Sequence, residues 1–163
     1  MLNLTLERIE RQIRNLPVER AFLLDQERGI MWQTTDDLPD GVSFSLEELH
    51  SMDGGILTHN HPGGRSLSTD DVLLARMWKL QEIRVVTAKQ RFSIKPPEEG
   101  WNPTPTEVFL TVLRRELGLL DRQVEDEIAR GILTAARADL VYHHRLWERM
   151  ASHGLVRYAA ERW

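Results

Sequence analysis

Cysteine is absent from the 163-residue sequence. Disulfide bonds, cysteine nucleophiles, thiolate zinc sites and iron–sulfur clusters are therefore excluded. Any metal site must use histidine, aspartate, glutamate and water. An excess of basic charge is also absent, because 21 lysines and arginines stand against 25 aspartates and glutamates, for a formal net charge of −4. This balance argues against nucleic acid and against an anionic membrane as partners.

Long apolar runs are missing as well. No stretch approaches the roughly 18 apolar residues of a membrane span. The segment Met1–Arg14 mixes charged with apolar side chains and lacks the apolar core of a signal peptide. We therefore expect no membrane contact and a cytoplasmic location. Hydrophobic residues make up 41% and charged residues 28% of the sequence, which indicates a globular protein.

Helix and strand patterns alternate in the first part of the chain. Apolar residues at helical spacing predict a helix over residues 4–15. Serines followed by acidic residues predict further helix starts at Ser45 and Ser68. Short apolar or β-branched runs predict strands at residues 21–24, 30–32, 56–58, 83–87 and 91–94. This order of elements indicates an α/β sandwich.

The second part of the chain has a different pattern. Four of the seven prolines lie in the segment 95–105, which predicts a linker between a domain at 1–97 and a helical extension at 105–163. Apolar stripes predict two or three helices up to about residue 152, interrupted near Gly118 and Gly131, with no strand. We expect this extension to pack on the sandwich, to dimerise or to bind a partner, and not to join the chemistry. Its adjacent histidines, 143 and 144, are expected to be core-edge or surface residues.

Residues suited to chemistry gather around two histidines that follow a predicted strand. His59 and His61 are one residue apart, so in an extended segment both imidazoles point to the same side. A glycine-rich loop follows and can bring Asp71, in the first turn of the next helix, to the same place. A His-x-His pair alone is a weak signal. Two imidazoles, one carboxylate and one open position, however, form the ligand set of a catalytic zinc site.

This stretch resembles a known motif. The string His-Asn-His-Pro at residues 59–62, followed by glycine and then by Ser68-x-x-Asp71, is similar to the JAMM motif of the MPN (JAB) metalloprotease family. The similarity is greatest to the bacterial and phage-associated branch and to RadC-like domains, and it covers residues 17–95. One difference is a loop, between the second histidine and the serine, that is one residue shorter than in most members.

The resemblance implies a fold and a set of roles. The fold would be the MPN (JAB, cytidine-deaminase-like) α/β sandwich, here with a C-terminal helical extension. His59, His61 and Asp71 would bind Zn²⁺, and Ser68 would polarise the scissile carbonyl and support the oxyanion. The family also places a catalytic glutamate near the start of a strand beside the metal strand. Glu19 fits this position best, since it directly precedes the predicted strand at 21–24.

The activity implied by the resemblance is that of a zinc metallopeptidase or isopeptidase. Its substrate would be a protein or peptide, with ubiquitin-like proteins among the candidates, and the C-terminal helices would serve oligomerisation or a partner. Two alternatives stay open: a RadC-like accessory domain that acts near DNA without proteolysis, and a catalytically silent MPN scaffold. The intact ligand set argues against the scaffold, and the net charge of −4 argues against direct DNA binding.

Overall fold

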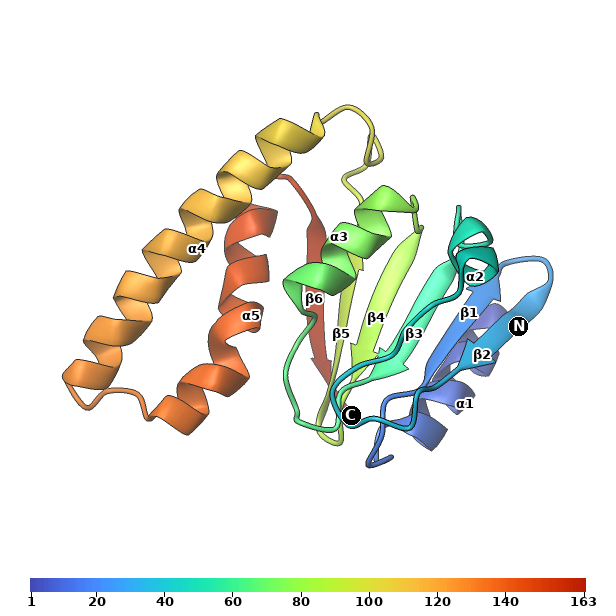
Figure 1. The fold of residues 1–163 in the computed structure, drawn as a ribbon, viewed down its shortest axis with the longest axis horizontal. Helices are drawn as coiled ribbons and strands as arrows, with labels where there is room; N and C mark the ends of the chain where they lie inside the picture. Colours follow the sequence, from blue (N-terminus) through green and yellow to red (C-terminus); the bar gives the residue numbers. More distant parts are fainter.

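One mixed β-sheet with helices on both faces makes up the computed structural model, which describes residues 1–163 (Figure 1). Its strands are β1 (Ala21–Asp25), β2 (Gly29–Thr34), β3 (Ile56–Asn60), β4 (Glu82–Val86), β5 (Gln90–Lys95) and β6 (Arg157–Arg162). The six strands lie in the order β2-β1-β3-β4-β5-β6, and only β3 and β4 are parallel. The predicted α/β class is confirmed.

The helices are α1 (Leu2–Ile13), α2 (Leu46–His50), α3 (Thr69–Met77), α4 (Thr106–Ala129) and α5 (Ala135–Ser152). Helix α1 covers one face of the sheet, whereas α2, α3 and α5 lie on the other face, and α4 packs on the outer side of α5 (Figure 1). None of these helices has the length and apolar character needed to cross a membrane.

Alternate residues of the central strands face two separate cores. Phe22 and Ile56 belong to a cluster of seven buried residues beneath α1. Leu23 and Leu57 belong to a cluster of 23 buried residues on the opposite face. The larger cluster also contains buried side chains of α4 and α5, so the carboxyl-terminal helices share a core with the sheet.

The predicted hairpins and the two serine-capped helices are confirmed. Ser45 and Ser68 each accept a hydrogen bond from the backbone N–H three residues later, and both form complete capping boxes. The predicted break at Gly118 is wrong, because α4 continues through it. A single glycine costs a helix only about 1 kcal/mol relative to alanine, and the packing of α4 on α5 overrides that cost.

The expectation of no strand after residue 105 is also wrong. Residues 157–162 form β6, which pairs antiparallel with β5 along its whole length. Most side chains of β6 are exposed, so the strand lacks the alternation of apolar and polar residues that reveals a half-buried strand. Its place in the sheet is set by backbone hydrogen bonds at a sheet edge, which leave little mark on the sequence.

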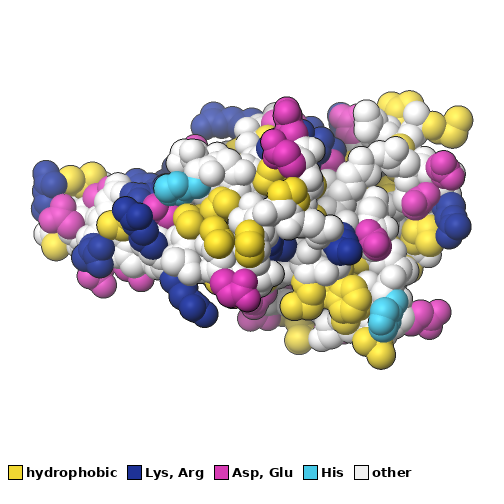
Figure 2. Space-filling view, turned by 90° about the horizontal axis from the view of Figure 1, so that it is seen from above, with side chains coloured by type: hydrophobic (Ala, Val, Ile, Leu, Met, Phe, Trp, Pro, Cys, Tyr) yellow, Lys and Arg dark blue, Asp and Glu magenta, His cyan; other side chains and the backbone are white.

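The surface carries both signs of charge side by side. In the view from above, dark blue and magenta side chains are interspersed from the α4–α5 end at the left to the opposite end (Figure 2). The face drawn in Figure 2 therefore presents no broad basic area. The protein also has exposed ion pairs within one helix, such as Arg11 with Glu7 and Arg130 with Asp126.

Candidate metal centre

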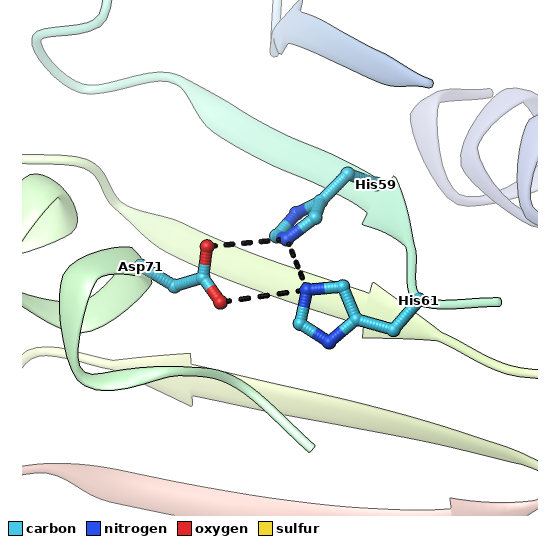
Figure 3. Close-up of side chains that lie close together, drawn as sticks. All are labelled: His59, His61 and Asp71. Atoms are coloured by element: carbon cyan, nitrogen blue, oxygen red, sulfur yellow. Dashed lines mark hydrogen bonds and ion pairs between the residues drawn. The ribbon is translucent and has the colours of Figure 1, made fainter. Parts of the chain in front are cut away.

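The end of β3 and the start of α3 bring three ligand-type side chains together (Figure 3). His59 lies in β3, His61 directly follows it, and Asp71 lies in the first turn of α3. One ligand atom from each residue can be chosen so that all lie within 4.8 Å of one another. The juxtaposition predicted from the sequence is confirmed.

Distances within this group fit a small cation. The His59 Nε2 atom lies 3.1 Å from His61 Nε2 and 3.2 Å from Asp71 Oδ1. The His61 Nε2 atom lies 3.6 Å from Asp71 Oδ2. Ligand atoms of a tetrahedral zinc site lie about 3.3 Å apart, since the bonds are about 2.0–2.1 Å long. The residues present therefore suit a tetrahedral ion.

Backbone carbonyls fix the tautomer of His61. Its Nδ1 atom lies 3.1 Å from the carbonyl oxygen of Arg65 and 3.2 Å from that of Ser66. Because a carbonyl oxygen can only accept, Nδ1 carries the proton, and the lone pair of neutral His61 is on Nε2. Hydrogen bonds of this kind orient metal-binding histidines.

The three side chains shift one another's pKa values. Burial lowers the pKa of His59, but the charge of Asp71, its hydrogen bond to His59 and the charge of Glu19 together raise it. Burial raises the pKa of Asp71, yet His59 holds it well below its usual range. Burial and the charge of His59 lower the pKa of His61 to about 4. His59 therefore favours the protonated form, paired with Asp71, more than a free imidazole does, whereas His61 favours the neutral form.

Ser68 orients the carboxylate of Asp71. The Asp71 N–H donates to Ser68 Oγ over 3.1 Å, and the Ser68 hydroxyl and N–H donate to Asp71 Oδ2 over 2.8 and 2.7 Å. Asp71 thus closes the capping box of α3 with Oδ2 and offers Oδ1 to His59.

Sheet register places Glu19 beside the histidines. Ala21 of β1 pairs with His59 of β3, and the Glu19 Oε1 atom lies 3.9 Å from His61 Nε2. Glu19 is only 7% exposed. Burial raises its pKa to about 7, although the charge of His59 acts in the opposite direction.

Asn60, which the sequence analysis did not single out, holds the segment that carries Glu19. Its side-chain oxygen accepts from the Arg20 N–H over 2.8 Å, and its amide donates to the Val18 carbonyl over 2.9 Å. The alternation of side chains in β3 is the signal that could have revealed it, since the residue between two inward histidines must point the other way.

A cavity of about 600 Å³ opens onto the group. Its lining includes Glu19, Ser68 and, from α5, His143. His143 is half-buried and is not one of the three grouped residues, as expected of a core-edge residue, and through it the carboxyl-terminal part supplies a wall of the cavity. No local pattern reveals this, because the position of α5 over the loop is decided by tertiary packing.

Comparison with protein-family models and with curated proteins gives no match for this chain. The chemistry open to the site follows from its donor atoms. A group of two imidazoles and one carboxylate can bind a divalent transition metal. The separations described above favour a tetrahedral ion, and the buried carboxylate of Glu19 adds a group that accepts protons near neutral pH.

Metal-free protein is expected to bind one Zn²⁺ per chain, with a dissociation constant that depends on pH. Below the raised pKa of His59, zinc must displace the proton shared with Asp71. The dissociation constant should therefore rise about tenfold for each unit that the pH falls. Competition with a chromophoric chelator at several pH values measures this dependence.

Two variants, Asp70→Asn and His61→Ala, show whether zinc binds at the three grouped residues or is merely attracted by acidic side chains of the cavity. Asp70 lines the same cavity but is not one of the three grouped residues, so Asp70→Asn should bind zinc as the wild type does. His61→Ala should lose tight binding. Equal affinity of His61→Ala and the wild type would contradict the assignment.

Proposed function

We propose that the protein is a zinc-dependent peptidase or isopeptidase of the JAMM/MPN type. The observation that carries this proposal is the buried carboxylate of Glu19, which lies 3.9 Å from His61 Nε2 and has a pKa raised to about 7. A general base works best when its pKa is near the operating pH. Glu19 shares one cavity with all three residues that would hold the metal.

Each residue has a distinct role in the proposed reaction. His59, His61 and Asp71 hold the ion, and a bound zinc ion supplies a Lewis acid that lowers the pKa of water to about 7. Glu19 accepts the proton of a water molecule in the cavity and later returns it to the leaving amine.

Ser68 is assigned to the substrate carbonyl. In the free protein its hydroxyl donates to Asp71, and the residue also lines the cavity. Turned towards the cavity, the same hydroxyl can donate to the carbonyl oxygen and stabilise the negative charge that develops there.

A protein or peptide is the substrate class that the cavity favours. Its wall carries acidic Asp40 and Asp70, basic Arg65 and the imidazole of His143, so it offers partners for the amide groups and polar side chains of an extended chain. Ubiquitin-like proteins belong to this class. Neither alternative from the sequence analysis is favoured: the net charge of −4 does not support a role at DNA, and a silent scaffold needs no buried base.

Glu19→Gln should keep the metal and the fold but lose about 10²–10⁴-fold in turnover, because an amide cannot accept the proton. The assay is incubation of the zinc-loaded protein with a peptide library in ¹⁸O-labelled water. Mass spectrometry then detects new carboxyl termini that carry the label.

Glu47→Gln is the matched control, since Glu47 lies in α2 and outside the cavity. It should leave cleavage unchanged. Full activity of Glu19→Gln, or no labelled termini from the zinc-loaded wild type, would contradict the proposal.

Ser68→Ala should lower both stability and turnover. Loss of the cap costs about 1 kcal/mol of unfolding free energy, whereas loss of a donor to the oxyanion costs about 10²–10³ in turnover. Ser45→Ala removes an equivalent capping box from α2, so it should reproduce only the stability loss. Urea unfolding and the cleavage assay measure the two effects. If turnover of Ser68→Ala falls only in step with its folded fraction, Ser68 is a cap alone.

A further inference from the structure

The loop from His61 to Ser68 is held by residues near the carboxyl terminus. It begins at His61, a predicted metal ligand, and ends at Ser68, which caps α3 and donates to Asp71. The shape of the loop therefore sets the distance between His61 and Asp71. The buried Trp147 donates from Nε1 to the Leu67 carbonyl over 2.7 Å. The adjacent residue of the loop, Ser66, places its hydroxyl 3.0 Å from the Tyr158 hydroxyl of β6.

The neighbours of Tyr158 show which hydroxyl donates in its contact with Ser66. The Tyr158 hydroxyl lies 2.7 Å from Nδ1 of His144, whose Nε2 faces the Glu148 carboxylate at 3.4 Å. Because the carboxylate only accepts, the tautomer that fits both neighbours has its N–H at Nε2, and Nδ1 accepts from Tyr158. The tyrosine oxygen is then the acceptor for the Ser66 hydroxyl. Ser66 is 1% exposed, so loss of this partner would leave its hydroxyl in a buried position.

The same serine contacts the metal centre through its backbone. The Ser66 carbonyl is one of the two oxygens that accept from His61 Nδ1 and so aim Nε2 at the site. We propose that Tyr158 is a positioning residue for the metal centre and acts through Ser66 on His61. This inference rests on the metal-binding part of the proposed function and is independent of peptide hydrolysis.

The consequence is that β6 belongs to the functional unit. Tyr158 is 92 positions from Ser66 in the sequence, and its strand lies at the edge of the sheet beyond β5. Outer-shell partners of metal-binding histidines commonly account for 10–100-fold in metal affinity. We expect loss of the Tyr158 hydroxyl to lower the zinc affinity by a factor in this range.

Tyr158→Phe tests the inference, with Zn²⁺ as the only probe. The zinc dissociation constant, measured by chelator competition on the full chain, should rise about 10–100-fold. Tyr142→Phe is the matched control, because it removes the other tyrosine hydroxyl, which donates to Asp121 of α4 rather than to the loop. It should leave the constant unchanged. Ser66→Ala should weaken binding similarly, and the double variant should be no weaker than either single variant if both changes remove one interaction.

An unchanged zinc affinity in folded Tyr158→Phe overturns the inference and leaves the proposed peptidase intact. Equal losses in both phenylalanine variants also overturn it, since they indicate general destabilisation. If Tyr158→Phe does not fold, Ser66→Ala removes the same hydrogen bond from its other side, and unchanged affinity there has the same meaning.

Hydrogen exchange covers the case in which the wild type binds no zinc and the proposed function itself fails. In metal-free protein the Gly64 amide donates within the loop and the Ser68 amide donates to Asp71. Both should exchange faster in Tyr158→Phe than in the wild type or in Tyr142→Phe. Unchanged exchange rates overturn the positioning role.

Discussion

Two imidazole nitrogens and a carboxylate meet within 4.8 Å at the end of β3, which places three groups that carry lone pairs in one small space. Buried polar groups without a partner are costly. In metal-free protein the contact of His59 with Asp71 pairs two of these groups, and Asp71 raises the pKa of His59. A divalent ion in the same place would satisfy all three groups at once, and much of the surrounding structure holds these side chains in position.

Both secondary structure and contacts to the loop after β3 hold the side chains of the site in position. Antiparallel pairing of β1 with β3 brings Glu19 to the histidines, and Asn60 holds the chain just before β1. The capping box of α3 fixes Asp71. The loop between β3 and α3 is anchored by Trp147 of α5 and by Tyr158 of β6. A site held by strands and helix ends is more rigid than one built on loops alone.

Local rules explain what the sequence could predict. Serine followed by an acidic residue three positions later predicted the starts of α2 and α3, because a capping box involves only neighbouring residues. The period of two in strands predicted that His59 and His61 face one side. Glu19 was chosen from the family pattern, and the structure places it 3.9 Å from His61.

Long-range contacts explain which features the sequence could not predict. The strand β6 has mostly exposed side chains, and its partner is decided by the whole sheet. His143 and Tyr158 reach the site only because α5 and β6 pack against a loop that lies far away in the sequence. The residues next to them in the sequence form no pattern that predicts these contacts. An apolar stripe on a helix does not indicate which loop the helix will cover.

X-ray absorption spectroscopy of the zinc-loaded protein tests the central claim most directly. The account predicts a four-coordinate shell in which two imidazoles bind at about 2.0–2.1 Å and oxygen atoms at about 2.0–2.2 Å complete the set. His61→Ala should then retain scattering from one imidazole. A shell of oxygen atoms without imidazole scattering, or a spectrum that His61→Ala leaves unchanged, would contradict the assignment of His59, His61 and Asp71 as a metal centre.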